Sequence, residues 1–323
     1  MVDRLVVLVI LALAKNCHAV DSLKFLVMGD WGGLPDYPYD TPVEKAVAKQ
    51  MASVAQMYDT SFIMALGDNF YFDGVKDVDD KRFERTFENV YHYDVLKKTP
   101  WYLVAGNHDH NGNVSAQIAY SKKSERWNFP NYYYVLQYKI PGGKTVDIVM
   151  IDTILLCGNT KHDFLGDQPK RPDNIKASED QWTWIELQLQ ISKADYLLVA
   201  GHFPVYSIAE HGPTKCLVDR LKPMLYKYKV SAYFNGHDHN LQHITYTEND
   251  HTVEYFTTGA ANFVDTSTEH KSDIPDHSLK FHWAEIVELG GFSYVEATTQ
   301  NMTMIFVDGE NKQLYRYVFP PRN

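Results

Sequence analysis

Five short apolar runs in this chain end abruptly in polar residues flanked by glycine, and this repeated pattern constrains the fold more than any other feature. The runs are FLVMGD ending at Asp30, FIMALGD at Asp68, WYLVAGNHD at Asn107 and His108, YLLVAGH at His202, and SAYFNGHDH at His237 and His239. Runs this short, without polar alternation, are typical of strands buried on both faces. The pattern therefore predicts a sheet that is covered on each side.

Helical segments separate these strands. Amphipathic spacing predicts helices over about 41–58, 79–90 and 178–192. Alternating strands and helices indicate a largely parallel sheet covered by helices. After His239 the chain reads mainly as strands, which we expect to form a second, more antiparallel sheet packed on the first. The predicted fold is α/β, a four-layer α/β/β/α sandwich of two mixed sheets flanked by helices, within a single catalytic domain over residues 20–323.

The polar residues that end the strands are all potential metal ligands. In open α/β sheets, ligands bind at the carboxyl ends of the strands, so these side chains are expected to converge. Taken singly, an Asp or His at such a position is more often a turn or cap residue. Together, carboxylates and imidazoles suit iron, manganese or zinc, and a carboxylate such as Asp68 can bridge two metals. The pattern favours a two-metal site.

The blocks GDWG, GDNFY, GNHD, VAGH and GHDH, in this order, resemble the signature blocks of the calcineurin-like metallophosphoesterases, and specifically of the purple acid phosphatases. The stretch YSIAEHGPT and the compact length are similar to the small, tartrate-resistant animal enzymes of that family. The resemblance covers nearly the whole mature chain. It implies two iron ions: a ferric ion held by Asp30, Asp68, Tyr71 and His239, and a divalent ion, usually iron, held by Asp68, Asn107, His202 and His237.

Tyr71 distinguishes this chain within the wider superfamily. Many metallophosphoesterases place a histidine two residues after the first aspartate, but this chain has Gly32 there. The resemblance implies that Tyr71 replaces the missing ligand, whereas the alternative is an ordinary packing residue among 22 tyrosines. A phenolate is anionic and hard, and a trivalent cation favours this ionised form. We therefore expect Tyr71 to select ferric iron and to give the protein a visible colour.

The resemblance implies an acid phosphatase that hydrolyses phosphate monoesters, either small molecules or phosphoproteins, and that phosphate-like oxyanions inhibit. Metal-bound hydroxide would attack the phosphorus, and His108 or His211 would protonate the leaving group. A phosphodiesterase or neutral phosphatase of the same fold would more naturally keep the missing histidine and lack Tyr71. An iron-carrying or redox protein that generates reactive oxygen is a third hypothesis, although storage needs no proton donor.

Charge and cysteine use indicate an exported protein that does not bind nucleic acid. The net charge is -10 and no basic run is longer than KK, so an extended phosphate-binding surface is excluded. Residues 1–19 carry Arg4, an apolar run and Ala19, which is the pattern of a secretory signal peptide. No later stretch is apolar enough to span a membrane. We therefore expect a secreted or lysosomal protein, active as a monomer.

The mature chain would keep two cysteines, Cys157 and Cys216, which either form one disulfide bond or remain separate thiols. Two sequons, at Asn113 and Asn301, are candidate glycosylation sites. The polar stretch over 158–178 resembles the family's repression loop, which lies over the site and which a processing protease cuts; Asp163 would reach toward the metals. An inert surface loop is the alternative for this stretch.

Overall fold

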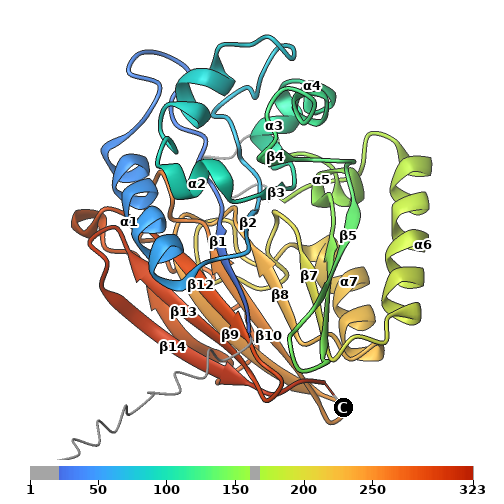
Figure 1. Cartoon of the computed structure of the whole chain (residues 1–323). Coiled ribbons are helices and arrows are strands. Elements are labelled where there is room, and N and C mark those ends of the chain that lie inside the picture. Colours follow the sequence, from blue (N-terminus) through green and yellow to red (C-terminus); the bar gives the residue numbers. More distant parts are fainter. Residues whose placement is uncertain (1–21, 161–167, 323) are drawn as a thin grey trace, which may run out of the picture.

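The computed structural model describes residues 22–160 and 168–322, in which two seven-stranded sheets pack face to face with helices on both outer faces (Figure 1). The helices are α1 (Pro42–Tyr58), the π-helix η1 (Phe83–Glu88), α2 (Asp94–Lys98), α3 (Asn107–Asn111), α4 (Val114–Tyr120), α5 (Thr153–Cys157), α6 (Ile175–Ile191), α7 (Lys215–Lys227) and the 3-10 helix η3 (Ile286–Glu288). This arrangement confirms the predicted α/β/β/α sandwich.

The first sheet has the strand order β14-β13-β12-β1-β2-β3-β4. Its strands are β1 (Leu23–Met28), β2 (Phe62–Ala65), β3 (Trp101–Leu103), β4 (Trp127–Asn128), β12 (Gly291–Ala297), β13 (Met302–Asp308) and β14 (Gln313–Phe319). Strands β1 to β4 run parallel, whereas β12 pairs antiparallel with β1 and continues into an antiparallel meander.

The second sheet has the order β11-β9-β10-β8-β7-β6-β5. Its strands are β5 (Tyr134–Lys139), β6 (Thr145–Met150), β7 (Tyr196–Ala200), β8 (Ala232–Asn235), β9 (Leu241–Glu248), β10 (His251–Thr258) and β11 (Leu279–Trp283). Strands β6, β7, β8 and β10 are parallel, and antiparallel strands lie at both edges.

The expectation that the strands after His239 form a sheet of their own is wrong. Strands β9 to β11 extend the second sheet, beside β8, whereas β12 to β14 extend the first sheet, beside β1. The N-terminal strands are divided between the sheets in the same way. The physical reason is that each sheet combines parallel strands with antiparallel ones, so the change of strand direction does not mark the sheet boundary.

Three apolar clusters separate the four layers. One lies between the first sheet and the helices that cover it, including α1; the second lies between the two sheets; and the third lies between the second sheet and α6 and α7. Strand β1 contributes to two of them, because Leu26 and Met28 face the first cluster while Phe25 and Val27 face the second. Successive side chains of a strand point to opposite faces of the sheet. A strand that is buried on both faces therefore needs apolar residues at every position, as β1 has from Phe25 to Met28.

The predicted helices form with altered ends. Thr41 caps α1, because its hydroxyl accepts a hydrogen bond from the Glu44 amide. The segment over 79–90 is helical only in η1. Helix α6 begins at Ile175 with Asn174 as its N-cap. Residues 175–178 of the stretch predicted to be a loop are therefore helical, and only the part before them remains irregular in the described residues.

Cys157, the last residue of α5, and Cys216 in α7 form a disulfide bond, which confirms one of the two alternatives predicted for these cysteines. We expect the double variant Cys157→Ala/Cys216→Ala to lose about 4 kcal/mol of unfolding free energy, since the bond closes a loop with a sequence separation of 59. Urea unfolding with and without reductant measures this change. Equal stability of the variant and the oxidised wild type would contradict it.

Four other predictions concern membrane spans, the signal peptide, Asp163 and glycosylation. Across residues 22–160 and 168–322, no helix combines the length and apolar character needed to cross a membrane. The predicted signal peptide, residues 1–19, lies outside the described residues, as does Asp163. Asn113 is exposed at the start of α4, and Asn301 is partly buried between β12 and β13. Glycosylation of both remains a prediction.

Candidate metal centre

The structure brings the predicted ligands together at the carboxyl ends of parallel strands from both sheets. Strands β1, β2 and β3 lead to Asp30, Asp68 and Asn107, and strands β7 and β8 lead to His202, His237 and His239. Tyr71 follows β2 in the same loop as Asp68. The site therefore lies where the two sheets meet, which is the position expected from the pattern of strand ends.

One group of these side chains consists of Asp30, Tyr71 and His239. The Tyr71 hydroxyl donates to Asp30 Oδ1 at 3.3 Å and lies 3.0 Å from His239 Nε2. His239 Nε2 lies 3.7 Å from the same carboxylate oxygen. Three atoms with lone pairs thus converge from three separate loops, and Asp30 and Tyr71 are fully buried. This is a donor set for a cation.

The second group consists of Asp68, Asn107 and His202. His202 Nδ1 lies 2.9 Å from the carbonyl oxygen of Leu66, so it carries the proton and donates, which leaves the Nε2 lone pair free in the neutral ring. Nε2 lies 2.8 Å from Asn107 Oδ1 and 3.4 Å from Asp68 Oδ2. The lone pairs of these two oxygen atoms and of Nε2 point toward one another, so the atoms repel each other unless a proton or a metal ion lies between them.

The electrostatics of the buried groups agree with this need for positive charge. Ligand atoms of Asp30, Asp68 and His202 all lie within 4.8 Å of one another. Burial raises the pKa of Asp30 well above its usual range. Burial lowers the pKa of His202, but the carboxylates of Asp68 and Asp30 outweigh it and raise that pKa to about 10. Without metal the cluster thus draws in a proton, so the residues fit a pair of cations.

His237 joins the two groups. Its amide donates to Asp30 Oδ2 at 2.8 Å, and its ring lies 5.0 Å from that of His202 between centroids. Burial, with His211 nearby, lowers the pKa of His237 well below its usual value. A neutral imidazole is the form that binds metals, so this ring is prepared for ligation.

The strand ends turn sharply so that these side chains point back over the sheets. Asp30, Asp68 and His237 have φ values of 58°, 50° and 70°, in the left-handed region that non-glycine residues seldom adopt. The flanking glycines make room for them. A Cβ atom on Gly106 would lie 2.1 Å from Asp68 Oδ1. The glycine-flanked pattern of the sequence therefore reflects space that the carboxylates occupy.

The packing around Gly32 explains why this chain has Tyr71 and lacks a histidine at position 32. A Cβ atom on Gly32 would lie 2.6 Å from the Phe70 amide nitrogen and 2.7 Å from that of Tyr71. The Tyr71 amide donates to the Gly32 carbonyl oxygen at 3.1 Å. Any side chain at position 32 would push away the loop that carries Tyr71. In this backbone arrangement, a histidine at position 32 and Tyr71 in its present place exclude each other.

Sequence reasoning did not identify Asp109, although it belongs to the GNHD block. Its buried carboxylate accepts hydrogen bonds from the amides of Asn69, Phe70 and Gly106 and from Gln117 Nε2. Burial and nearby Asp68 raise the pKa of Asp109 to about 6. The carboxylate joins the Asp68 loop to the Asn107 turn and so fixes the spacing of these two loops, which carry predicted ligands. Nothing in the sequence distinguishes it from a solvated loop aspartate.

His110 is a second residue of this turn that the sequence did not single out. Its Nε2 atom lies 2.8 Å from Asp152 Oδ2, and Asp152 caps α5. The main chain of Asp152 in turn pairs with the Gln181 side chain of α6. The pair therefore ties the turn that carries Asn107 to the helices over the second sheet.

A cavity of about 310 Å³ opens over the predicted ligands. His108 and His211 both line it, as predicted for proton donors. His108 Nδ1 donates to the Phe72 carbonyl oxygen at 2.8 Å, and His108 Nε2 lies 4.0 Å from Asp68 Oδ2. The His211 ring stacks on His237 with centroids 3.9 Å apart. The cavity is also lined by five residues that the sequence did not single out: Phe72, Glu210, Phe263, Val264 and Asp265.

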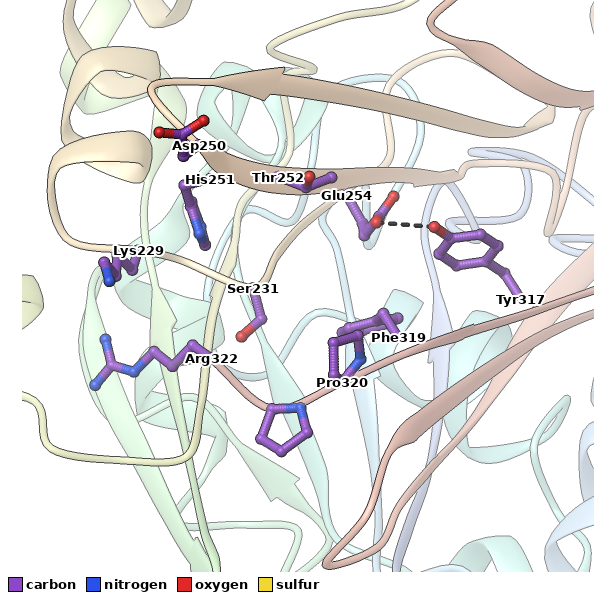
Figure 2. A pocket seen from close by; sticks show the side chains of 11 residues that line it. Lys229, Ser231, Asp250, His251, Thr252, Glu254, Tyr317, Phe319, Pro320 and Arg322 are labelled. Atoms are coloured by element: carbon purple, nitrogen blue, oxygen red, sulfur yellow. Dashed lines mark hydrogen bonds between the residues drawn. The ribbon is translucent and has the colours of Figure 1, made fainter.

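A second cavity of about 350 Å³ lies apart from these ligands, near the end of β14 (Figure 2). Several of its polar groups have partners within the fold: Tyr317 donates to Glu254, whose other oxygen lies 2.8 Å from His243 Nε2. The Arg322 guanidinium donates to the carbonyl oxygens of Ala194, Tyr228 and Ser192. Predicted metal ligands line the first cavity and not this one.

The comparisons with known proteins agree with this geometry. The family model for calcineurin-like phosphoesterases matches residues 23–241. Tartrate-resistant acid phosphatase type 5 of Oryctolagus cuniculus is 50% identical over 305 residues, covering 94% of this chain and 93% of that protein. Purple acid phosphatase 4 of Arabidopsis thaliana is 30% identical, covering 92% of this chain and 83% of that protein.

Among solved structures, GAP50, the anchor in the inner membrane complex of Plasmodium, superposes with a TM-score of 0.78 at 25% identity, covering 94% of this chain and 90% of that one. The match to the family model takes in all the predicted metal ligands, and the similarity to the animal enzyme spans nearly the whole chain. The chain therefore belongs to the calcineurin-like phosphoesterase family and, within it, to the purple acid phosphatases of the tartrate-resistant type.

Proposed function

We propose that this protein is an acid phosphatase that hydrolyses phosphate monoesters at a two-metal centre. The observation that carries the proposal is the cavity in which His108 and His211 stand beside the converging ligands. A protein that only stored iron would need the metal ligands, but it would not need proton donors lining an open cavity beside them. The same cavity argues against the iron-carrying or redox alternative as the main activity.

The proposed ligand sets share Asp68. Ferric iron is assigned to Asp30, Asp68, Tyr71 and His239, and a divalent ion, iron in the first instance, to Asp68, Asn107, His202 and His237. When bound, the two ions offset charge on the phosphate and lower the pKa of water, which makes it a nucleophile in acid. Phosphate-like oxyanions would occupy the same place and inhibit.

The chain's own residues supply the proton for the leaving group. Because His108 Nδ1 donates to the Phe72 carbonyl, its Nε2 is the atom that gains or loses a proton. This Nε2 atom lies 4.0 Å from Asp68 Oδ2. The backbone of His211 is also held in place, because its amide donates to Asp238 Oδ1 at 3.0 Å. Either ring can donate to an alkoxide or phenoxide that departs into the cavity.

The aromatic side chains that line the cavity also indicate which leaving groups it can accept. The rings of Phe72 and Phe263 are nearly parallel, with centroids 6.3 Å apart and an interplanar angle of 15°. Flat apolar leaving groups can pack on such rings. The substrates proposed are therefore small phosphomonoesters or exposed phosphorylated side chains of proteins.

The cellular setting forms part of the same proposal. The signal-peptide pattern of residues 1–19 and the disulfide bond support a secreted or lysosomal protein, glycosylated at Asn113 and Asn301. We propose a monomer whose loop near Asp163 is cut by a processing protease to raise activity.

Hydrolysis of p-nitrophenyl phosphate and bis(p-nitrophenyl) phosphate between pH 4 and pH 8 tests the function. We expect a preference for the monoester and an optimum in acid. The double variant His108→Ala/His211→Ala should lose about 10²- to 10⁴-fold in kcat while keeping its metals, because general acid catalysis contributes about that much.

His251→Ala is the matched control for the histidine variants. His251 Nε2 lies 2.8 Å from the Val230 carbonyl oxygen, so this ring also donates to a backbone carbonyl, but it lines the distant cavity of Figure 2. Its kcat should equal that of the wild type. Faster hydrolysis of the diester, or an alkaline optimum, would overturn the proposed function.

A further inference from the structure

The loops that carry Gly32 and Tyr71 are joined by one guanidinium group. Arg82 Nη1 donates to the Tyr71 carbonyl oxygen at 2.5 Å, and Nη2 donates to the Gly32 carbonyl oxygen at 2.6 Å. The two acceptors belong to segments that follow different strands, β1 and β2. A planar guanidinium holds two acceptors at a fixed spacing, so Arg82 fixes one loop relative to the other.

Further contacts fix the Arg82 side chain itself. Its Nε atom donates to Thr86 Oγ1 at 3.0 Å, and that hydroxyl donates to the Tyr39 carbonyl oxygen at 3.0 Å. The guanidinium carbon lies 5.6 Å from the centre of the Phe70 ring, and the residue is only 8% exposed. All three acceptors of the guanidinium are uncharged oxygens. The direct hydrogen bonds of the cation therefore fix geometry, while the carboxylates of Asp80 and Glu44 act on its charge without accepting from the guanidinium.

The spacing that Arg82 fixes bears directly on the metal centre. Gly32 and Tyr71 are in close backbone contact, with no room for a Cβ atom at position 32. The phenol oxygen of Tyr71 lies between Asp30 and His239, at 3.3 Å and 3.0 Å. If the loops separated, this oxygen would leave Asp30, because Asp30 precedes Gly32 in the other loop. First-shell ligands need such supporting contacts to hold their geometry.

We propose that Arg82 is the positioning residue that holds Tyr71 in place as a metal ligand, by clamping the Gly32 and Tyr71 carbonyls together. The role rests on the proposed metal centre. Arg82 does not line the cavity over the metals and touches neither the predicted ligands' side chains nor the substrate. Its effect passes through the Tyr71 main chain.

The test compares Arg82→Lys with Arg126→Lys. Arg126 is a close match: it is 5% exposed, donates to the Tyr91 and Leu96 carbonyl oxygens, and lies 4.1 Å from the centre of the Phe87 ring. Its Nη2 atom also donates to Glu88 Oε2 at 2.6 Å, so its hydrogen-bond acceptors are Tyr91, Leu96 and Glu88 rather than Gly32 and Tyr71. Lysine keeps the charge in both variants but cannot bind two carbonyls as a fork. Each variant is loaded with iron, and three quantities are measured: the visible band per bound iron, ferric affinity by chelator competition, and the Tm.

We expect both variants to have a lower Tm, but only Arg82→Lys to lose or shift the visible band. Its ferric affinity should fall about ten- to hundredfold, the range for loss of a hydrogen bond to a charged group. Arg126→Lys should keep the wild-type band and affinity. A wild-type band and affinity in Arg82→Lys would overturn the role, as would an equal loss in Arg126→Lys.

Thr86→Val is the alternative variant if Arg82→Lys does not fold. It removes the Nε acceptor, together with the hydrogen bond from the hydroxyl to the Tyr39 carbonyl, and preserves the shape of the side chain. It should shift the band in the same direction by a smaller amount, and an unchanged band would overturn the role. A wild-type protein without a tyrosine-dependent band would overturn the proposed centre and this role together. A coloured wild type with an equally coloured Arg82→Lys variant would overturn the role alone.

Discussion

Tyr71→Phe is expected to abolish the visible absorption band of the iron-loaded protein and to weaken ferric binding by more than about 100-fold, beyond the usual effect of an outer-shell substitution. The variant removes one oxygen atom from a fully buried ring, so packing is almost unchanged. That oxygen lies within 3.3 Å of both Asp30 and His239. Absorption spectra and iron content of the purified proteins measure the two effects.

Tyr91→Phe is the control for this variant. Tyr91 is also fully buried, and among the described residues its hydroxyl has no hydrogen-bond partner. The change thus removes a buried phenol oxygen that has no hydrogen bond to a predicted ligand, and colour and iron content should stay at wild-type values. A coloured Tyr71→Phe protein with full iron content would contradict the assignment of Tyr71.

His202→Ala is expected to release the divalent ion and to lower kcat by at least about 10³-fold, since one metal of a two-metal site supplies several kcal/mol of transition-state stabilisation. The ring is fully buried, and Nε2 is its atom nearest to Asn107 and Asp68. No neighbouring histidine is free to replace it, because His237 is already assigned to the same ion. Metal analysis and steady-state kinetics measure the loss.

His243→Ala separates this loss from simple destabilisation. His243 is as fully buried as His202, with Nδ1 2.9 Å from the Tyr315 hydroxyl and Nε2 2.8 Å from Glu254. It lies in the polar contact between the two sheets rather than at the metal centre. Its replacement should lower the Tm while metal content and kcat per folded molecule remain normal. Equal kinetic losses in the two variants would refute the role of His202.

The convergence of the predicted ligands was predictable from the sequence because these residues follow a local rule. Each of Asp30, Asp68, Asn107, His202 and His237 ends a short apolar strand, and parallel strands place such ends at one edge. The resemblance to a known family added Tyr71, which is not at a strand end. The covering of both sheets by helices followed from the alternation of elements.

The supporting contacts were not predictable in the same way. Arg82 acts through two backbone carbonyls that lie 11 and 50 positions away along the chain, and no local pattern marks such a partnership. Asp109 accepts from amides up to 40 positions away. The division of β9 to β14 between the sheets depended on pairing with β1 and β8, which burial patterns alone do not reveal. Long-range hydrogen bonds, unlike periodicity, leave little trace in a single sequence.

The most direct test of the central claim is anomalous X-ray diffraction at the iron edge from crystals of the purified protein. The account predicts two metal peaks about 3.5–4 Å apart, the usual spacing in two-metal sites. The Tyr71 oxygen should be bonded to one ion, iron, and Asp68 should lie between the two. A single peak, or two ions of which neither is within bonding distance of Tyr71, would contradict it.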